Sequence, residues 1–286
     1  MAEVINLTSS EVEYIKKNKK LIGKGVDGAL YNIKGDILYK LYHDLSPEVL
    51  INNNAIYDSE GVNISGVLPF RRRIAKFNNI INYVDSDGVI LCREEALNKA
   101  IEKQKKIKRT LLPQGIVKEN NRVIGCIYKK YNTIWGIYAT SCLPLEYRYN
   151  VCRKVIYKVQ ELLDNNIYLT TLAQRNEILS FSKKDSNVLL DYKLEPLIID
   201  LDGISALYSD TFIDSKYKVA LCGLSKLVLE IITKRDLSYE YLDNYKEEYI
   251  QILKQYNIDL EYIHKFYDYG YLEIEELKNV LIKKKS

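Results

Sequence analysis

The character of the chain changes at Pro144. Before this residue, short apolar segments alternate with turns rich in glycine, aspartate and asparagine; after it, apolar residues recur at helical spacing, as over residues 147–163. Strands in the first half and helices in the second predict an α+β fold, in which sheet and helices form separate regions. We therefore expect two lobes, residues 18–135 and 136–286, preceded by a helix over residues 1–17.

The first lobe is expected to be a small antiparallel sheet with one helix. The turn Lys34-Gly35-Asp36 is typical of a tight hairpin. A helix is expected over residues 94–109, followed by a second hairpin within residues 116–131, while residues 46–92 show no clear pattern and are expected to be an insertion. The apolar segments that begin this sheet are residues 20–24, 29–34 and 37–42.

The second lobe is expected to be mostly helical. Two short apolar segments, residues 187–191 and 196–200, interrupt the helical pattern and predict a pair of strands, the second of which ends in a carboxylate. The helices are expected over residues 147–163, 217–233, 239–256 and 272–284.

Charge and hydropathy exclude several classes of protein. The 42 Lys and Arg residues are interspersed with 38 Asp and Glu residues, which leaves a net charge of +4 and argues against a dedicated nucleic-acid-binding protein. No stretch reaches the roughly 18 to 20 apolar residues of a membrane span, and the first twenty residues lack the apolar run of a signal peptide. We expect a cytoplasmic protein with no nucleic-acid or membrane partner.

Histidine and cysteine are too sparse for the common catalytic sites that use them. The two histidines, His43 and His264, stand alone, which argues against a zinc hydrolase and against a histidine-dependent nucleophile. The five cysteines form no C-x-x-C pair and are expected to be reduced, buried residues. Chemistry would have to rest on lysine, aspartate, asparagine and backbone amides.

A glycine pattern and a lysine stand out in the expected sheet. Gly23-x-Gly25-x-x-Gly28 lies between two expected strands, whereas a dinucleotide-binding turn lies between a strand and a helix. A hairpin turn that needs flexible residues is the alternative explanation. Lys40 follows twelve residues later inside an apolar segment, where alternation alone would also allow it to lie on a solvated strand face.

Polar residues flank the two strands expected in the second lobe. Asn187 precedes Asp200 by thirteen positions, and both adjoin apolar strands. A carboxylate at the end of a buried strand needs a cation or hydrogen-bond donors to offset its desolvation, so a Mg²⁺ ligand is a reasonable role. The alternative is a cap or an Asx turn, a role that Asp202 also fits.

The order and spacing of these features resemble the protein-kinase-like fold over about residues 18–235, including a D-x-D motif, Asp200-Leu201-Asp202, found in many bacterial kinase-like proteins. The resemblance implies that the protein binds ATP and Mg²⁺. The amides of Gly23, Gly25 and Gly28 would then lie over the phosphates.

The resemblance also implies roles for single residues. Lys40 would contact the α and β phosphates, and Glu102, or alternatively Glu95, would orient it from the following helix. Residues 125–128 resemble the hinge after the fifth strand, so Cys126 would contact the adenine. Asn187, Asp200 and Asp202 would be the metal ligands.

The catalytic loop departs from the family pattern. Counting back from Asn187, the position of the catalytic aspartate is occupied by Ser182; in a second register, ending at Asn176, it is occupied by Thr171. Asp185 is then the nearest substitute carboxylate in the first register. A hydroxyl is a poor proton acceptor near neutral pH, although phosphoryl transfer depends more on positioning and charge stabilisation than on a base.

Three functions are compatible with these features. The first is an ATP- and Mg²⁺-dependent phosphotransferase that acts on an unidentified small-molecule or protein acceptor. The second is an inactive pseudokinase that senses nucleotide or binds other proteins. The third is a helical binding protein with an unrelated small sheet, in which Lys40 and Asp200 would lie far apart.

Overall fold

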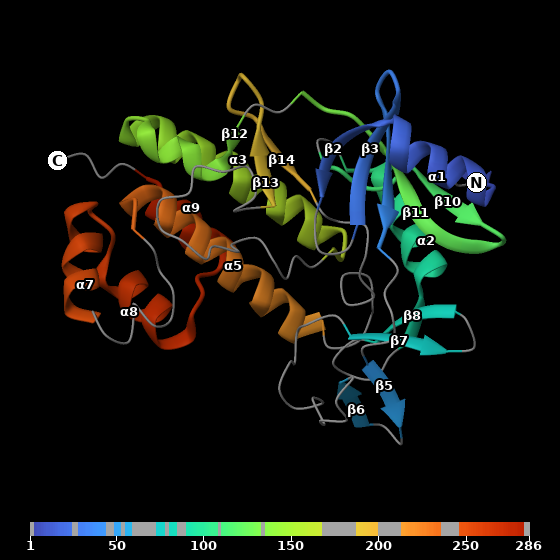
Figure 1. Cartoon of the computed structure of the whole chain (residues 1–286). Helices are drawn as coiled ribbons and strands as arrows, with labels where there is room; N and C mark the ends of the chain where they lie inside the picture. The colour runs from blue at the N-terminus through green and yellow to red at the C-terminus, as the bar shows by residue number, and fades with distance from the viewer. Residues whose placement is uncertain are drawn as a thin grey trace. The chain divides into compact units, whose positions relative to one another are not determined.

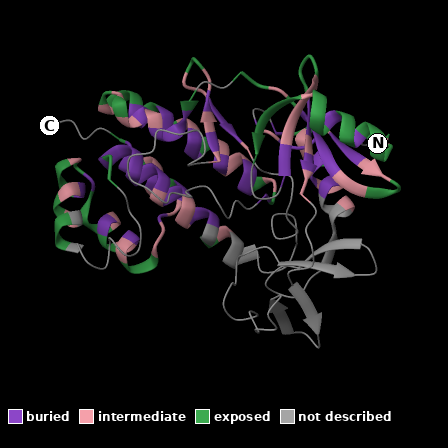
Figure 2. Cartoon of the chain, in the orientation of Figure 1, coloured by how far each residue is buried: buried purple, intermediate pink, exposed green. Residues whose placement is uncertain are grey.

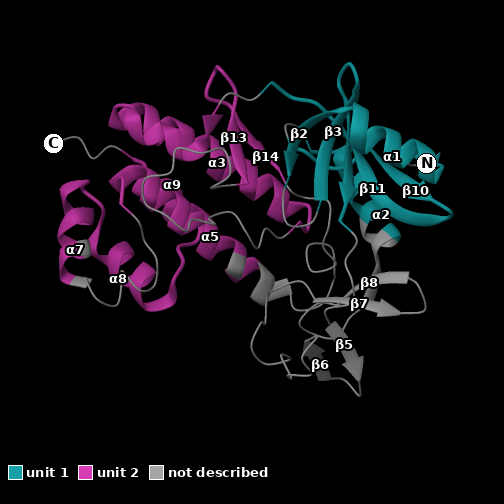
Figure 3. Ribbon diagram, viewed as in Figure 1, with its two compact units in different colours: residues 1–132, 200–212 teal, residues 133–199, 213–286 magenta. Residues whose placement is uncertain are grey.

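The structure of the protein is a computed structural model (Figure 1). Buried residues are concentrated in the strands of a sheet and in the longest helices (Figure 2). The chain divides into two compact units: the first comprises residues 1–132 and 200–212, and the second comprises residues 133–199 and 213–286 (Figure 3). The structure describes residues 3–24, 28–43, 49–52, 55–58, 73–77, 80–84, 90–107, 110–132, 135–167, 187–199, 213–235 and 246–282.

A six-stranded sheet forms the first unit. Its strand order is β1-β10-β11-β4-β3-β2, and every pairing is antiparallel except that of β1 with β10. The predicted hairpins are confirmed, because the glycine- and asparagine-containing turns do connect paired strands. The strands are β1 (Glu3–Leu7), β2 (Lys20–Lys24), β3 (Gly28–Lys34), β4 (Ile37–Tyr42), β10 (Gly115–Glu119) and β11 (Arg122–Lys129).

The N-terminal segment is a strand followed by a helix: the predicted N-terminal helix is present but begins at Ser9, and Glu3–Leu7 form a strand instead. Helix α1 (Ser9–Asn18) starts after β1, at Thr8, whose side chain accepts a hydrogen bond from the Glu11 amide while Glu11 accepts one from the Thr8 amide. This capping box ends the strand and fixes the helix start. The hydrogen bonds from Thr8 lower the pKa of the Glu11 carboxyl.

Helix α1 covers one face of the sheet. Its buried residues Val12 and Ile15 belong to a cluster with sheet side chains that include Tyr39 and Val117. Because β1 lies at one edge of the sheet and β2 at the other, α1 connects the two edges across this face.

Helix α2 (Arg93–Gln104) packs against the opposite face of the sheet. It ends earlier than the predicted Arg109. Its buried residues Leu97 and Ile101 belong to a second apolar cluster, which also contains the sheet residues Leu38, Ile116, Cys126 and Tyr128.

The region predicted to be an insertion, residues 46–92, contains strands. They form a two-stranded sheet, β5-β6, and a three-stranded sheet, β7-β8-β9. Each of these strands has at most five residues, so alternation has little length over which to be recognised. The strands are β5 (Val49–Asn52), β6 (Ala55–Asp58), β7 (Arg73–Phe77), β8 (Ile80–Val84) and β9 (Ile90–Cys92).

The second unit is mostly helical, as predicted. The helix predicted over 147–163 is confirmed as α3 (Leu145–Asp164), and that over 217–233 as α5 (Ile213–Thr233). The other elements are β12 (Trp135–Gly136), the 3-10 helix η1 (Ile137–Cys142), β13 (Val188–Leu190), β14 (Pro196–Ile198), α7 (Lys246–Gln255), α8 (Leu260–Tyr269) and α9 (Ile274–Val280). Among the described helices, none combines the length and apolarity needed to span a bilayer.

Two buried polar contacts connect α3 and η1 to α5. Arg148 of α3 is 5% exposed, and its Nη1 donates hydrogen bonds to the carbonyl oxygens of Ile231, at 3.1 Å, and Ile232 in the last turn of α5. The Tyr138 hydroxyl of η1 donates to Oε2 of the buried Glu230 at 2.7 Å. These contacts satisfy polar groups in the interior of the unit.

The four cysteines whose side chains are described, Cys126, Cys142, Cys152 and Cys222, are free, and only some match the expectation of burial. Cys126 and Cys152 are buried, whereas Cys222 is half-buried and Cys142 is exposed on η1. Burial, which penalises the charged thiolate, raises the pKa of the Cys152 thiol from 9.0 to about 12.

This difference in burial predicts selective alkylation. At pH 8, iodoacetamide is expected to modify Cys142 in the folded protein and to leave Cys126 and Cys152 unmodified until denaturant is added. Peptide mass spectrometry checks this result; modification of Cys152 before Cys142 in native protein would contradict it.

The raised pKa of Cys152 also predicts how stability depends on pH. Because the thiol of Cys152 titrates at about 12 in the folded state, the unfolded state loses this proton first, and the free energy of unfolding falls between about pH 9 and pH 12.

Candidate functional site

Lys40 emerges from an apolar face of the sheet. In the register of the three central strands, it lies opposite Leu30 of β3 and opposite Cys126 of β11. Directly opposed residues of antiparallel strands point to the same face. Cys126 is part of the cluster under α2 and Leu30 packs against that cluster, so Lys40 lies on the α2 face. Its side chain is half-buried there, so it does not lie on a fully solvated strand face.

Two glycines allow the backbone to approach β4 closely on either side of Lys40. A Cβ atom on Gly28 would lie 2.5 Å from the carbonyl oxygen of Leu41, and one on Gly125 would overlap the carbonyl oxygen of Lys40 itself. Gly125 was not among the predicted site residues, because nothing in a buried strand sequence shows which glycine touches a neighbouring backbone. The close approach of the neighbouring backbone is therefore enough to explain glycine at position 28, whether or not a ligand binds there.

The remaining glycines of the pattern are placed differently. Gly23 lies in β2, and a Cβ atom there would meet no described atom within 4 Å. Gly25, between β2 and β3, lies outside the described residues. The contact of the three glycines with phosphates stays a prediction.

Cys126 is an interior strand residue, so the interpretation of residues 125–128 as a hinge after the strand was wrong. Strand β11 continues to Lys129 and pairs with β10 on one side and β4 on the other. Cys126 is fully buried, and its Sγ accepts a hydrogen bond from the Tyr42 hydroxyl at 3.4 Å. A strand paired on both edges has no free backbone edge for an adenine.

The glutamates of α2 are distributed around the helix. Glu102 is exposed, next to Ile101, which faces the sheet. Glu94, for which no role was predicted, forms an ion pair with Lys118 of β10, with 2.7 Å between Nζ and Oε1. The side chain of Glu95 is not among those that the structure describes. A glutamate partner for Lys40 therefore stays a prediction, and the exposure of Glu102 does not favour it.

In the second unit, the hairpin β13-β14 positions the predicted metal ligand Asn187. Val188 pairs with Ile198, and the Ile199 amide donates to the Asn187 carbonyl oxygen at 2.9 Å. At the other end of the hairpin, Asp191 accepts hydrogen bonds from two amides of the turn, those of Lys193 and Glu195.

The β13-β14 register makes Ile199 the cross-strand neighbour of Asn187. Asn187 is half-buried and lies opposite Ile199, the residue that immediately precedes Asp200 in the chain. Asp200 itself lies outside the described residues, as do the other predicted loop residues, Asp185, Asp202, Ser182, Thr171 and Asn176. Within the described part of the chain, no cluster of three or more His, Cys, Asp or Glu side chains could hold a metal ion.

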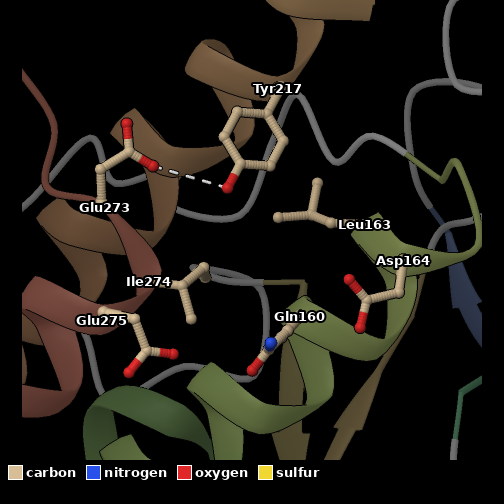
Figure 4. A pocket seen from close by; sticks show the side chains of 7 residues that line it. All are labelled: Gln160, Leu163, Asp164, Tyr217, Glu273, Ile274 and Glu275. Carbon is tan, nitrogen blue, oxygen red and sulfur yellow. Dashed lines mark hydrogen bonds between the residues drawn. The ribbon is translucent and has the colours of Figure 1, made fainter.

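A separate cavity of about 250 Å³ lies between α3, α5 and the start of α9 (Figure 4). The Tyr217 hydroxyl points towards Glu273, with 3.5 Å between the oxygen atoms. Burial, the nearby Glu273 and, more weakly, Asp164 raise the pKa of the Tyr217 phenol. The residues that line the cavity are Gln160, Leu163, Asp164, Tyr217, Glu273, Ile274 and Glu275.

None of the residues predicted for the nucleotide site lines this cavity. Three of its lining side chains are carboxylates, which repel a phosphate group. The cavity is therefore not the binding site for nucleotide phosphates.

Comparison with known proteins gives the fold. No protein-family model matches the sequence, and no curated protein is similar to it in sequence. In structure, the chain is similar to a pseudokinase solved in its apo form, with a TM-score of 0.53 and 14% sequence identity over 98% of this chain and 94% of that chain. It is also similar to the pseudokinase drought responsive inactive kinase 1 bound to ENMD-2076, with a TM-score of 0.51 and 14% identity over 98% and 96%.

Both matches extend over nearly the full length of the two chains compared. The α+β chain therefore has the two-lobed protein-kinase-like fold. The third possibility raised by the sequence, a helical protein with an unrelated sheet, is excluded.

Proposed function

We propose that this chain, which has the two-lobed protein-kinase-like fold, is a pseudokinase that binds ATP with Mg²⁺ but does not transfer phosphate. The observation that carries the proposal is the absence of a carboxylate where the fold family has its catalytic base. Ser182 occupies that position in one register of the loop and Thr171 in the other. Neither hydroxyl accepts a proton usefully near neutral pH.

The donor groups on both sides of the proposed site suit a magnesium nucleotide. Lys40 offers a cationic amine from an otherwise apolar sheet face, where a phosphate oxygen competes with little water. Asn187 and Asp200 would supply amide and carboxylate oxygens, the ligands that Mg²⁺ prefers; in the β13-β14 register, Ile199, the residue before Asp200 in the chain, lies opposite Asn187.

The same register favours a second candidate, a phosphotransferase acting on an unidentified small-molecule or protein acceptor. If Asn187 and Asp200 both bind the metal, the charge of the transferred phosphoryl group can still be neutralised. Asp185, two residues before Asn187, would then be the substitute carboxylate.

Thermal unfolding with and without ATP and Mg²⁺ tests binding, and ATP turnover tests catalysis. Ligand at a hundred times its dissociation constant stabilises the folded state by about 2.7 kcal/mol, so we expect a clear rise in the melting temperature. We expect no turnover above that of Asp200→Ala. An unchanged melting temperature would refute nucleotide binding, whereas turnover that Asp200→Ala abolishes would establish the phosphotransferase instead.

A further inference from the structure

Lysines are concentrated where α1 ends and β2 begins. Residues 16–24 contain five lysines and no carboxylate. The side chains of Lys16 and Lys17 are 48% and 75% exposed, and within the described residues their ion pairs are to Glu13, at 3.6 and 4.0 Å. All residues of β2 are exposed (Figure 2). We call this surface the basic edge; it comprises Tyr14, Lys16, Lys17, Lys19, Lys20, Leu21, Ile22 and Lys24.

Large apolar side chains lie among these lysines. Leu21 is 51% exposed and Ile22 is 42% exposed, and Tyr14 of α1 is 57% exposed. Leu21 lies opposite Tyr31, which packs against the cluster under α1, so Leu21 and the exposed side of α1 belong to the same side of the sheet. Lys24, opposite Ala29, lies on this same side of the sheet, whereas Lys20, opposite Asn32, lies on the α2 side, so the lysines of the basic edge lie on both sides of the exposed edge strand.

The shape of β2 argues against two of the partners that a sheet edge can bind. The register of β2 with β3 shifts between Leu21 and Gly23, which is an irregularity that interrupts a regular ladder for an added strand. Pairing with the β2 of a second copy would bring lysines against lysines. A partner that needs no ladder and carries negative charge fits better.

We propose that the basic edge binds an anionic lipid surface. Each lysine near an anionic lipid surface contributes about 1 kcal/mol of attraction, and exposed aliphatic side chains beside the lysines can enter the headgroup region. The expectation that the protein has no membrane partner rested on the lack of a spanning segment. A protein that lies on a membrane surface needs no such segment.

Sedimentation of the full chain with vesicles tests the proposal. At 0.1 M salt, we expect binding to vesicles of phosphatidylcholine with about 30% phosphatidylserine and no binding to phosphatidylcholine alone. Lys17→Gln with Lys20→Gln is expected to weaken partitioning about 30-fold. Leu21→Ser with Ile22→Ser is expected to weaken it at unchanged net charge.

A matched control separates the basic edge from overall charge. Lys105 and Lys106 follow α2 and are also exposed, so Lys105→Gln with Lys106→Gln removes the same charge elsewhere and should leave partitioning unchanged. Unchanged melting temperatures would show that the variants fold, as expected for exposed positions.

Three results would overturn the proposal. The first is no binding of the unchanged chain to the anionic vesicles, and the second is an equal loss of binding in the control variant. The third is release from the vesicles by soluble polyglutamate together with full binding by Leu21→Ser with Ile22→Ser, which would identify an acidic polypeptide as the partner.

Discussion

Replacing Arg148 with alanine is expected to lower the free energy of unfolding by about 3 kcal/mol, the loss typical of hydrogen bonds from a charged donor combined with a buried cavity. The guanidinium group is buried and donates to two carbonyl groups at the end of α5. Without the guanidinium group, the two carbonyl oxygens lose their hydrogen bonds from Arg148, and because the site is buried, water does not replace them. Urea unfolding followed by circular dichroism measures the change.

Arg153→Ala is the matched control. Arg153 lies on the same helix and donates to the Leu281 carbonyl oxygen just after α9, but its side chain is exposed. Water can replace the lost donor there, so we expect a loss below about 1 kcal/mol. Equal losses in the two variants would show that the burial of Arg148 is not what makes it important.

Replacing Lys40 with methionine is expected to weaken binding of ATP with Mg²⁺ by about 10- to 100-fold, as expected for the loss of a charge-assisted hydrogen bond to phosphate. Methionine keeps an unbranched apolar chain next to Leu30 and Cys126, so the packing of the α2 face is retained. The melting temperature without nucleotide should therefore change little. Isothermal titration calorimetry of the folded variant measures the affinity.

Lys118→Met provides the comparison for this result. Lys118 lies in the same sheet, and its ion pair with Glu94 connects β10 to α2. We expect a small loss of stability and an unchanged affinity for nucleotide. If both variants bind ATP as tightly as the unchanged chain, the role assigned to Lys40 is wrong.

The fold was predictable where local sequence determines local structure. The turn Lys34-Gly35-Asp36 made the hairpin β3-β4 predictable, since glycine readily adopts the positive φ that this turn needs, and Gly35 has a φ of 55°. The buried face of α3 was predictable because its apolar residues recur at helical spacing. The strand β1 was missed because its pairing is with β10, more than a hundred residues away. Nothing within residues 3–7 encodes such a partner.

The candidate site was less predictable, because its geometry depends on strand ends and on opposing residues. The segment around Cys126 has the composition of both a buried strand and a hinge, and only its pairing with β4 and β10 decides between them. The partners of the α2 glutamates depend on the rotation of the helix over the sheet, which its sequence does not specify. The closeness of Asn187 to Ile199, by contrast, follows from two short strands joined by a recognisable turn.

The pairing of Glu3–Leu7 with Gly115–Glu119 also constrains how the chain folds during synthesis. The segment Glu3–Leu7 is synthesised more than a hundred residues before its partner. At about 5 to 20 residues per second, that delay is on the order of ten seconds. Throughout that interval β1 is unable to complete its native pairing, and any chaperone or competing strand that engages β1 must release it before this edge of the sheet can close.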